Sequence, residues 1–379
     1  MKEYLDLPLE DGTKFCYQPK RLQSKINELD EFICDCSYMD NLVFAKKMLF
    51  SHELQANNQV EGYGDDLAFI EQVIQKKTKH IKSQDKRKRV LNLYRGYQYI
   101  LKNKIVDENH LSELYKILSS GLLEDSDLSR MGALYRGDTV YILNQGRLDY
   151  DLYEGVHYTN ISELMDKYFK FYHTSFGDNT KTDEYIKSQI LHFYFVYVHP
   201  YFDVNGRTSR TMSMWHLLNK EAYPYIIFNR GIRFQGSRYD KMILETSSHR
   251  DLTFFLQYML DTLKVELEKE YVMRVISSNV DCKLSGVDYQ TLLYLLTLNG
   301  VKTAKDFAQF YNRFNDKKSA KEIYEEMLLP LIDMEILNVI RYSKKHIFND
   351  VPNIIFDFNS NKLDGDMNKI KKLELPFNR

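Results

Sequence analysis

The chain is poor in cysteine: its 379 residues include only Cys16, Cys34, Cys36 and Cys282. So few cysteines at irregular spacing predict neither a disulfide framework nor a closed zinc site, and we interpret them as ordinary thiols. The segment Met1–Lys14 has mixed polarity and lacks the apolar run of a signal peptide. No segment approaches the roughly 18 apolar residues that a membrane span requires. These absences predict a protein of the reducing cytoplasm without a membrane partner.

The chain also has no excess of charge of either sign. Lysine and arginine total 52, and aspartate and glutamate total 53. The net charge therefore indicates no nucleic-acid partner, and any such partner would have to bind a local patch. The charged run from Lys76 to Arg89 lacks interleaved aromatic residues, so we interpret it as a solvated helix end or connector.

Proline and glycine are scarce as well, with 7 and 16 residues. Hydrophobic residues make up 44% of the chain, which is enough for a sizeable core. Apolar residues recur at three- and four-residue spacing in several segments, which predicts a mainly helical fold. The clearest of these segments are Ile26–Ile33, Leu111–Leu118, Ile161–Tyr168 and Leu252–Leu260.

The helical pattern is interrupted at two places. Residues Asp138–Tyr150 alternate apolar and polar side chains and contain an Asn-Gln-Gly turn signal at Asn144–Gly146, which predicts a β-hairpin. Residues Ser277–Asp288 are polar, and we expect a domain boundary there. The predicted division is an N-terminal segment over 1–75, a central domain over 76–276 and a C-terminal domain over 277–379.

The C-terminal domain has the element order of a winged helix. Its spacing predicts three helices, over Tyr289–Leu298, Ala304–Phe314 and Ala320–Met334. Two short strands, Ile336–Tyr342 and His346–Phe348, follow and are joined by a Ser-Lys-Lys turn. Three helices and a hairpin predict a winged-helix-like domain.

The strongest chemical signal is the segment His199–Arg210, which reads HPYFDVNGRTSR. It lies between two apolar helical runs, Ile186–Val198 and Thr208–Asn219. A polar loop that opens a helix presents free backbone N–H groups and the positive end of the helix dipole. The segment therefore predicts an anion site.

The residue types around this loop suit attack on a magnesium-bound nucleotide. Arg207 and Arg210 lie three residues apart, on one face of the first helical turns, where two guanidinium groups can bind a polyphosphate. Asp203 supplies an oxygen ligand for Mg²⁺, and Gly206 lets the backbone approach phosphates closely. His199 can accept a proton from an incoming hydroxyl near neutral pH.

The segment resembles the Fic motif, His-x-Phe-x-Asp/Glu-Gly-Asn-Gly-Arg-x-x-Arg, and the resemblance extends over roughly Asp30–Leu263. It implies that His199 is the general base and that Asp203 is the ligand of Mg²⁺. It also implies that ATP is the donor, and that its phosphates are bound by Asn205, Gly206, Arg207 and Arg210.

Two positions depart from that motif. Tyr201 replaces the usual phenylalanine, which is a mild change for a core residue. Val204 replaces the first glycine; because a β-branched residue resists positive φ, we expect an altered anion loop that still offers its N–H to the nucleotide. Related Doc-type kinases carry lysine at the position of Gly206, so this chain resembles the AMP-transferring members.

An upstream stretch, Glu53–Gly62, resembles the inhibitory helix of the same family, Ser/Thr-x-x-x-Glu-Gly/Asn. Asn57 stands where serine or threonine is usual. The resemblance implies that Glu61 pairs with Arg210 and excludes the outermost phosphate of ATP. The enzyme is then expected to be mostly inactive at rest.

The predicted hairpin, counted as Tyr135–Tyr150, occurs where Fic proteins have a flap that docks the target chain. Its edge, Thr139, Val140, Tyr141 and Ile142, would bind an extended segment by strand addition. A plain surface hairpin remains the alternative. The resemblance also implies that a tyrosine lies near the adenine, and Tyr239 is the candidate.

We therefore predict a mainly α protein: a Fic helical core with a small hairpin flap, followed by a winged-helix-like domain. The expected reaction transfers AMP from ATP to a Ser, Thr or Tyr hydroxyl of a target protein, with self-modification also open. One alternative is a different nucleotide donor. Another is a regulator that binds DNA through residues 289–348, although lysines and acids are balanced there. A homodimer is left open, since no heptad pattern stands out.

Overall fold

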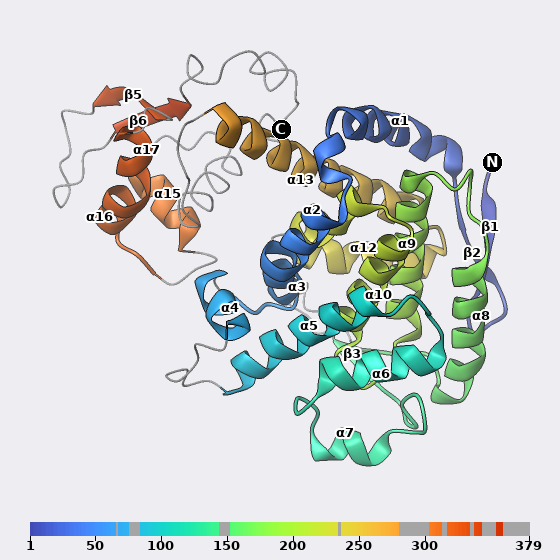
Figure 1. Ribbon diagram of the computed structural model, residues 1–379. Coiled ribbons are helices and arrows are strands. Elements are labelled where there is room, and N and C mark those ends of the chain that lie inside the picture. Colours follow the sequence, from blue (N-terminus) through green and yellow to red (C-terminus); the bar gives the residue numbers. More distant parts are fainter. Residues whose placement is uncertain are drawn as a thin grey trace. The chain divides into compact units, whose positions relative to one another are not determined.

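The computed structural model describes residues 1–65, 67–75, 84–143, 152–233, 236–279, 303–312, 317–333, 337–342 and 354–358. The chain divides into two compact units, Met1–Lys264 and Val265–Arg379. Helices dominate the described part, which also contains three antiparallel pairs of short strands (Figure 1). The predicted mainly helical fold with a small hairpin is confirmed.

The first unit is built almost wholly of helices, and the four helices predicted from apolar spacing lie within α1, α6, α8 and α13. Its short 3-10 and π-helical turns are η1 (Ser37–Met39), η2 (Leu49–Glu53), η3 (Tyr158–Asn160) and η4 (Tyr223–Ile227). Its α-helices are α1 (Pro19–Asp35), α2 (Leu42–Met48), α3 (Leu54–Val60), α4 (Leu67–Ile74), α5 (Gln84–Lys102), α6 (Glu108–Ser119), α7 (Asp125–Arg130), α8 (Ile161–His173), α9 (Lys181–Val198), α10 (Asn205–Asn219), α11 (Phe228–Ile232), α12 (Gly236–His249) and α13 (Thr253–Asn279). Helix α13 continues in sequence past Lys264, where the first unit ends.

Helices α9 and α10 form the centre of this unit. They pack against each other, with α8, α1 and α12 against α9 and with α5, α6 and α3 against α10. Nearly every residue of both helices is buried, as expected for helices covered on all sides. Their polar side chains find internal partners: His216 Nε2 lies 2.7 Å from Glu184 Oε2, and Lys187 Nζ donates to Tyr172 O at 2.8 Å. A capping box between Thr180 and Asp183 begins α9.

Two strand pairs lie beside these helices. Strand β1 (Glu3–Pro8) pairs with β2 (Lys14–Tyr17), and β3 (Tyr141–Leu143) pairs with β4 (Leu152–Glu154). The second pair is the predicted hairpin. Its returning strand begins just beyond Tyr150, where the sequence pattern ended, and residues 144–151 lie outside the described part.

The second unit contains α15 (Ala304–Tyr311), α16 (Ala320–Ile323), the π-helical η5 (Tyr324–Leu328) and α17 (Leu329–Asp333), followed by the antiparallel strands β5 (Leu337–Tyr342) and β6 (Ile354–Phe358). The predicted helix Tyr289–Leu298 and strand His346–Phe348 lie outside the described residues. The described partner of β5 is β6, further along the chain. The winged-helix assignment stays a prediction.

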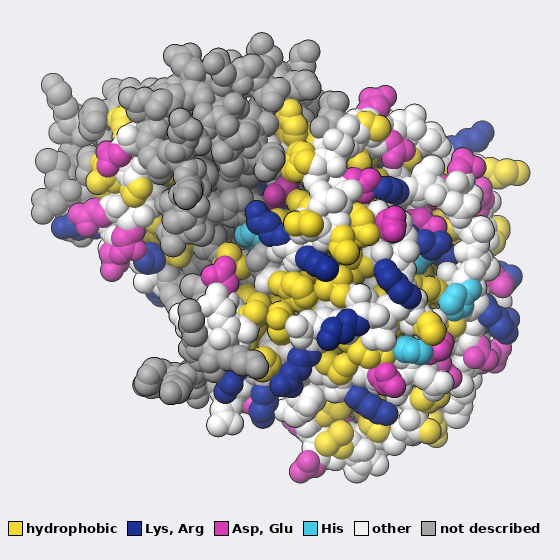
Figure 2. Space-filling model, in the orientation of Figure 1, with side chains coloured by type: hydrophobic (Ala, Val, Ile, Leu, Met, Phe, Trp, Pro, Cys, Tyr) yellow, Lys and Arg dark blue, Asp and Glu magenta, His cyan; other side chains and the backbone are white. Residues whose placement is uncertain are grey.

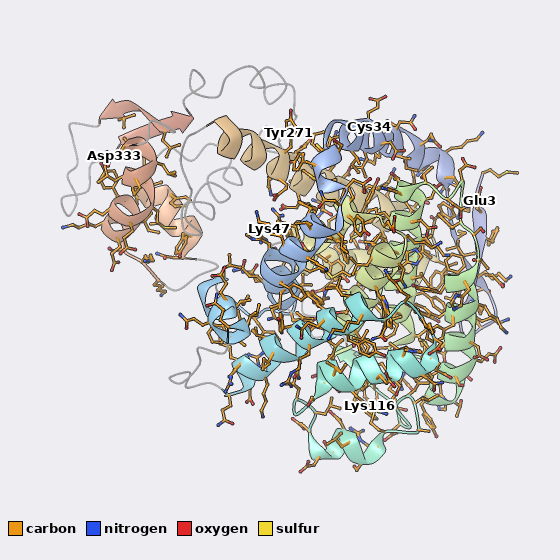
Figure 3. The ribbon with its side chains drawn as sticks, viewed as in Figure 1. Glu3, Cys34, Lys47, Lys116, Tyr271 and Asp333 are labelled. Carbon is orange, nitrogen blue, oxygen red and sulfur yellow. The ribbon has the colours of Figure 1, made fainter. Side chains whose placement is uncertain are left out.

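Charges of both signs are mixed with hydrophobic side chains on the visible face of the first unit, which matches the balanced composition (Figure 2). Cys34 lies exposed on α1 (Figure 3), while Cys16 and Cys36 are buried, and none of these three cysteines forms a disulfide. None of the helices in the described part of the chain combines the length and apolar character needed to cross a membrane.

Candidate active site

The loop between α9 and α10 is bracketed by two residues in the left-handed region. His199 caps α9 with a φ of 50°, and Val204 caps the start of α10 with a φ of 65°. This conformation costs an L-residue about 1–2 kcal/mol, so other contacts must hold the loop. Asn205 holds it from inside: its Oδ1 accepts the Tyr201 N–H at 3.0 Å and its Nδ2 donates to Tyr201 O at 2.8 Å. Val204 thus adopts the positive φ that we expected a β-branched residue to resist.

Arg136 holds the same loop from outside. Its Nε donates to His199 O at 2.9 Å, and its backbone N–H donates to Pro200 O at 2.9 Å. Its guanidinium also donates to Asp138 O at 2.7 Å and to Val156 O, on either side of the β3–β4 hairpin. One buried arginine therefore ties the loop to the hairpin.

His199 is half-buried, and its side chain is neutral at physiological pH. Burial, together with the nearby Arg136, lowers the pKa of His199 to about 4, although the Val196 carbonyl and Glu61 oppose this shift. The ring Nδ1 lies 3.4 Å from Val196 O. If Nδ1 carries the proton, Nε2 has a free lone pair with which to accept a proton from a substrate.

Asp203 is exposed beside the loop, and its Oδ1 accepts the Val204 N–H at 2.6 Å. No group of three or more potential ligand side chains lies close enough to hold a metal ion among the described residues. Mg²⁺ at nucleotide sites is bound by one or two carboxylates together with phosphate oxygens and water. A single exposed carboxylate next to an anion loop fits that mode of binding.

Gly206 and the two arginines lie on the first turns of α10. A Cβ atom on Gly206 would come within 2.4 Å of Glu61 Oε1 and 3.0 Å of Arg210 Nη1. Only glycine therefore permits the carboxylate to approach the helix start this closely. Arg207 and Arg210 are 3% and 1% exposed, so both charges are buried at the site.

The carboxylate over Gly206 belongs to Glu61, the residue that ends α3. Its Oε1 lies 2.5 Å from Nη2 of Arg210. Burial alone would raise the pKa of Glu61, but attraction to Arg210 and Arg207 lowers it below its usual value. The first unit thus brings together the two residues that the sequence resemblance paired, 149 positions apart.

Asn57 binds the same guanidinium from one turn earlier in α3. Its Oδ1 accepts from Arg210 Nε at 2.9 Å, and its Nδ2 donates to Tyr97 OH at 3.0 Å. The backbone carbonyl of Asn57 lies 3.4 Å from Arg210 Nη2. Asparagine therefore takes part in the arginine contact where the family motif has serine or threonine.

Tyr239, the candidate for an adenine contact, is 5% exposed. Its hydroxyl lies 2.5 Å from His192 Nε2, and the two rings stack with centroids 5.9 Å apart. The next residue, Asp240, interacts electrostatically with Glu61 and Arg210: burial, together with Glu61, raises the pKa of Asp240 to about 6, and Arg210 opposes this shift.

The flap residues form a partly open edge. Thr139 and Val140 precede β3 and are half-buried, and Tyr141 is 64% exposed. Within β3, Tyr141 pairs with Glu154 and Ile142 with Tyr153.

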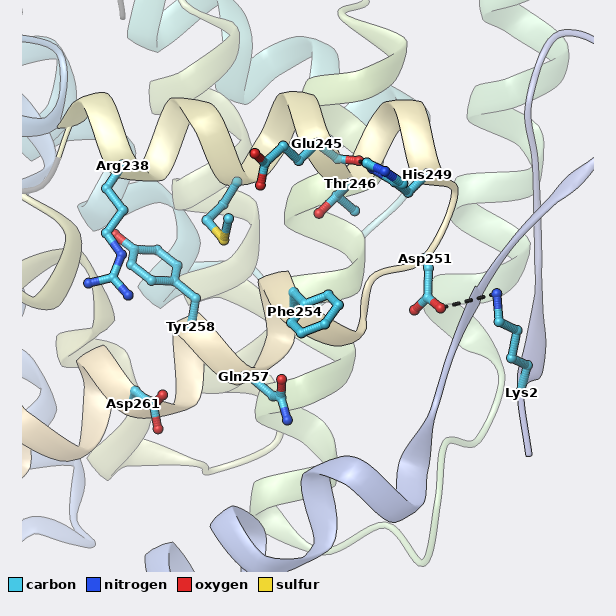
Figure 4. A pocket seen from close by; sticks show the side chains of 11 residues that line it. Lys2, Arg238, Glu245, Thr246, His249, Asp251, Phe254, Gln257, Tyr258 and Asp261 are labelled. Atoms are coloured by element: carbon cyan, nitrogen blue, oxygen red, sulfur yellow. Dashed lines mark hydrogen bonds and ion pairs between the residues drawn. The ribbon is translucent and has the colours of Figure 1, made fainter.

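A separate pocket of about 690 Å³ lies between α12 and the start of α13, beside Lys2 (Figure 4). It contains none of the predicted site residues. Its carboxylates already have cationic neighbours: Asp251 lies 3.3 Å from Lys2, Glu245 lies 3.5 Å from Lys241, and Asp261 pairs with Lys25.

Comparison with known proteins identifies the class. A model of the Fic/DOC family matches residues 105–217, which include the flap, the His199 loop and both arginines. The chain therefore contains a Fic/DOC family domain. Proteins with this domain are generally transferases of nucleotide-derived groups onto proteins.

A solved structure agrees at the level of the fold. A Fic family protein from Desulfovibrio desulfuricans G20 is 17% identical, with a TM-score of 0.55 over 90% of this chain and 96% of that one. Fic-1 from C. elegans, residues 134–508, is 15% identical, with a TM-score of 0.47 over 69% of this chain and 73% of that one.

Sequence reasoning missed two residues of this site. In the sequence, Asn57 is only a departure from the family motif. The signal that could have identified it is the need of a buried Arg210 for a hydrogen-bond acceptor. Arg136 gave no signal, because its role depends on carbonyls 63 residues away that only the fold brings near.

Proposed function

We propose that the protein transfers AMP from ATP to a hydroxyl of a target protein and is held inactive by Glu61. One observation carries this proposal: a buried arginine at the start of α10 is paired with a carboxylate placed over Gly206. An anion-binding group that accepts an internal carboxylate is suited to exchanging it for a phosphate.

In the proposed reaction, His199 accepts the proton of the target hydroxyl, whose oxygen bonds to the α-phosphorus of ATP. The bond from that phosphorus to the oxygen bridging the β-phosphorus breaks, and pyrophosphate leaves. Asn205 keeps the loop in shape, and the backbone of Gly206 faces the donor. Val204 would join it by turning its N–H from Asp203 Oδ1 to the donor. Arg207 and Arg210 bind the remaining phosphates. Bound Mg²⁺, held by Asp203, would neutralise charge that develops on the phosphates.

Glu61 opposes this reaction because it occupies donors of Arg210. An ion pair at that position competes directly with the outermost phosphate for the same guanidinium. Partial exposure of the Glu61 side chain, at 25%, leaves a path for its displacement.

The acceptor would bind along the edge formed by Thr139, Val140, Tyr141 and Ile142. An extended segment adds to a strand edge through backbone hydrogen bonds, with little demand on its sequence. Because Arg136 links this hairpin to His199, a hydroxyl of the bound target would be held at a fixed position relative to His199. Tyr239, buried against His192, is the proposed boundary of the adenine site. Self-modification belongs to the same proposal.

The test is transfer of label from α-labelled ATP in the presence of Mg²⁺, without an added target. Wild type, Glu61→Gly and His199→Ala are compared, and ATP binding is measured for each. The proposal predicts label on the protein that rises in Glu61→Gly and disappears in His199→Ala. Intact ATP binding without label in any variant, even with candidate targets added, counts against ATP as the donor. Absence of ATP binding would remove the roles assigned to Arg207 and Arg210.

A different nucleotide donor remains the second candidate, because Val204 alters the chemistry of the anion loop. Incubation with each labelled nucleotide separates these donors. The DNA-binding alternative concerns residues 289–348, and a gel shift at low salt without a retarded band would exclude it.

A further inference from the structure

Tyr63 lies between two arginines at the edge of the site. The guanidinium carbon of Arg207 lies over its ring at 5.9 Å from the centroid, and that of Arg89, from α5, lies over the same ring at 3.8 Å. Among the described residues, neither arginine has a carboxylate partner, and the Nε atoms of both are buried without a hydrogen-bond acceptor.

This contact leaves the donors of Arg207 available. An aromatic ring attracts a guanidinium through its face, whereas phosphates and carboxylates bind the N–H groups at its edge. The two arginines of α10 are therefore held differently. Arg210 is occupied at its edge by Glu61 and Asn57, whereas Arg207 is held from its face.

The backbone that carries the Tyr63 ring is itself held in place. Its backbone N–H donates to Asn58 O at 3.1 Å, and its carbonyl accepts the Asp65 N–H at 3.0 Å. Asp65 is buried and bound by Asn58 Nδ2 at 3.3 Å and by Lys86 at 3.3 Å. Asn58 O also accepts the backbone N–H of Glu61, but none of these contacts involves the Glu61 carboxylate, so displacing the carboxylate leaves the support of Tyr63 intact.

We propose that Tyr63 is a positioning residue that orients Arg207 towards the donor's phosphates, with Arg89 clamping the ring. The inference rests on the proposed function of Arg207 as a phosphate ligand. It separates two roles within seven residues of chain: Asn57 and Glu61 restrain the site, whereas Tyr63 prepares it.

The test uses inorganic tripolyphosphate as the probe, so that it does not depend on AMP transfer. All variants carry Glu61→Ala, which frees Arg210 and leaves a Cβ that limits backbone freedom next to Gly62. Calorimetry measures the dissociation constant of tripolyphosphate for Glu61→Ala alone and with Tyr63→Leu, Tyr63→Phe, Arg89→Gln or Arg87→Gln. Arg87→Gln is the matched control, since Arg87 is exposed on the same helix and makes the same charge change.

Tyr63→Leu and Arg89→Gln should each raise the dissociation constant about threefold to thirtyfold, while Tyr63→Phe and Arg87→Gln leave it nearly unchanged. With ATP as donor, KM should rise and kcat at saturation should be kept, which a general loss of folding would not produce. Unchanged tripolyphosphate affinity in Tyr63→Leu would overturn the inference. So would transfer that rises in Tyr63→Leu with Glu61 present, because Tyr63 would then be part of the brake. Binding of tripolyphosphate that follows the predicted order without AMP transfer counts against the proposed function alone.

Discussion

A Cβ atom on Gly206 would stand 2.4 Å from Oε1 of Glu61, closer than Cβ atoms come to non-bonded heavy atoms in proteins. Moving the carboxylate away would break its contact with Arg210 Nη2, 2.5 Å away. The absence of a side chain at Gly206 and the presence of the carboxylate are therefore coupled.

This coupling predicts that the effect of Gly206→Ala on the free energy of unfolding changes sign with the residue at position 61. With Glu61 present, alanine should lower the free energy of unfolding by about 1–3 kcal/mol through overpacking. With Glu61→Gly, the contact with the carboxylate is gone and only the 3.0 Å approach to Arg210 Nη1, the end of a long side chain that Glu61 no longer holds, remains. Alanine should then raise the free energy of unfolding by up to about 1 kcal/mol, through its helix propensity. Denaturant unfolding of wild type, Gly206→Ala, Glu61→Gly and the double variant measures both effects. Equal effects in the two backgrounds would contradict the contact.

Asn57→Ala should weaken the brake without abolishing it. The substitution removes the acceptor of Arg210 Nε while Glu61 still binds Nη2. AMP transfer should rise, but less than in Glu61→Gly, and stability should fall by about 1–3 kcal/mol because buried donors lose their partner. Tyr97→Phe is the control, since it removes the bond at the other end of the amide and keeps the Arg210 contact. Activity in Tyr97→Phe equal to that of Asn57→Ala would argue against a direct effect on Arg210.

The pH dependence of transfer should lack the acid limb of an ordinary histidine. A base with a pKa of about 4 is already deprotonated at pH 6, so kcat/KM should stay level from pH 6 to 8 and fall only towards pH 4. Glu61 raises the pKa of His199, so Glu61→Gly should move this limb to lower pH. If the rate of the active variant fell by half as pH was lowered from 7 to 6, His199 would have an ordinary histidine pKa.

Glu184 should stabilise the core far from the loop. Burial would raise its pKa, but hydrogen bonds from His216 and Lys220 lower the pKa of Glu184 to about 2. A depressed carboxyl pKa adds stability above the unfolded value near 4.5, and this stability is lost as pH falls towards 2. Glu184→Gln should therefore cost about 2 kcal/mol at pH 7, with a smaller difference from wild type at pH 3. The matched control is Glu245→Gln, because the exposed Glu245 forms a surface ion pair with Lys241; this substitution should change stability little.

The sequence predicted what local pattern and short motifs determine. Apolar spacing predicted the long helices because burial of one helix face imposes the helical period. The HPYFDVNGRTSR segment predicted the loop because all of its characteristic residues lie close together in the sequence. Glu61 and Arg210 could be paired only through a family resemblance. The fit of Asn57 to Arg210, and of Tyr63 between Arg89 and Arg207, depends on how α3 and α5 pack on α10. No local pattern records that packing.

Val204 shows why a conformational rule can fail in context. Its positive φ is unfavourable for an isolated valine, yet its side chain is 1% exposed and Asn205 fixes the preceding turn. Burial of an apolar side chain contributes about 1.5–3 kcal/mol, enough to offset the backbone cost. The sequence predicts the backbone cost of a positive φ at Val204, but it does not show the burial of the side chain that offsets this cost.

The four contacts of Arg136 have a consequence for how such a protein can diversify. The arginine holds the backbone of the loop and of both arms of the hairpin through carbonyl groups, which every residue type possesses. Side chains along Thr139–Ile142 can therefore be exchanged without moving His199. Under the proposed function, surface substitution alone would admit new acceptors, while His199 and its loop keep their arrangement.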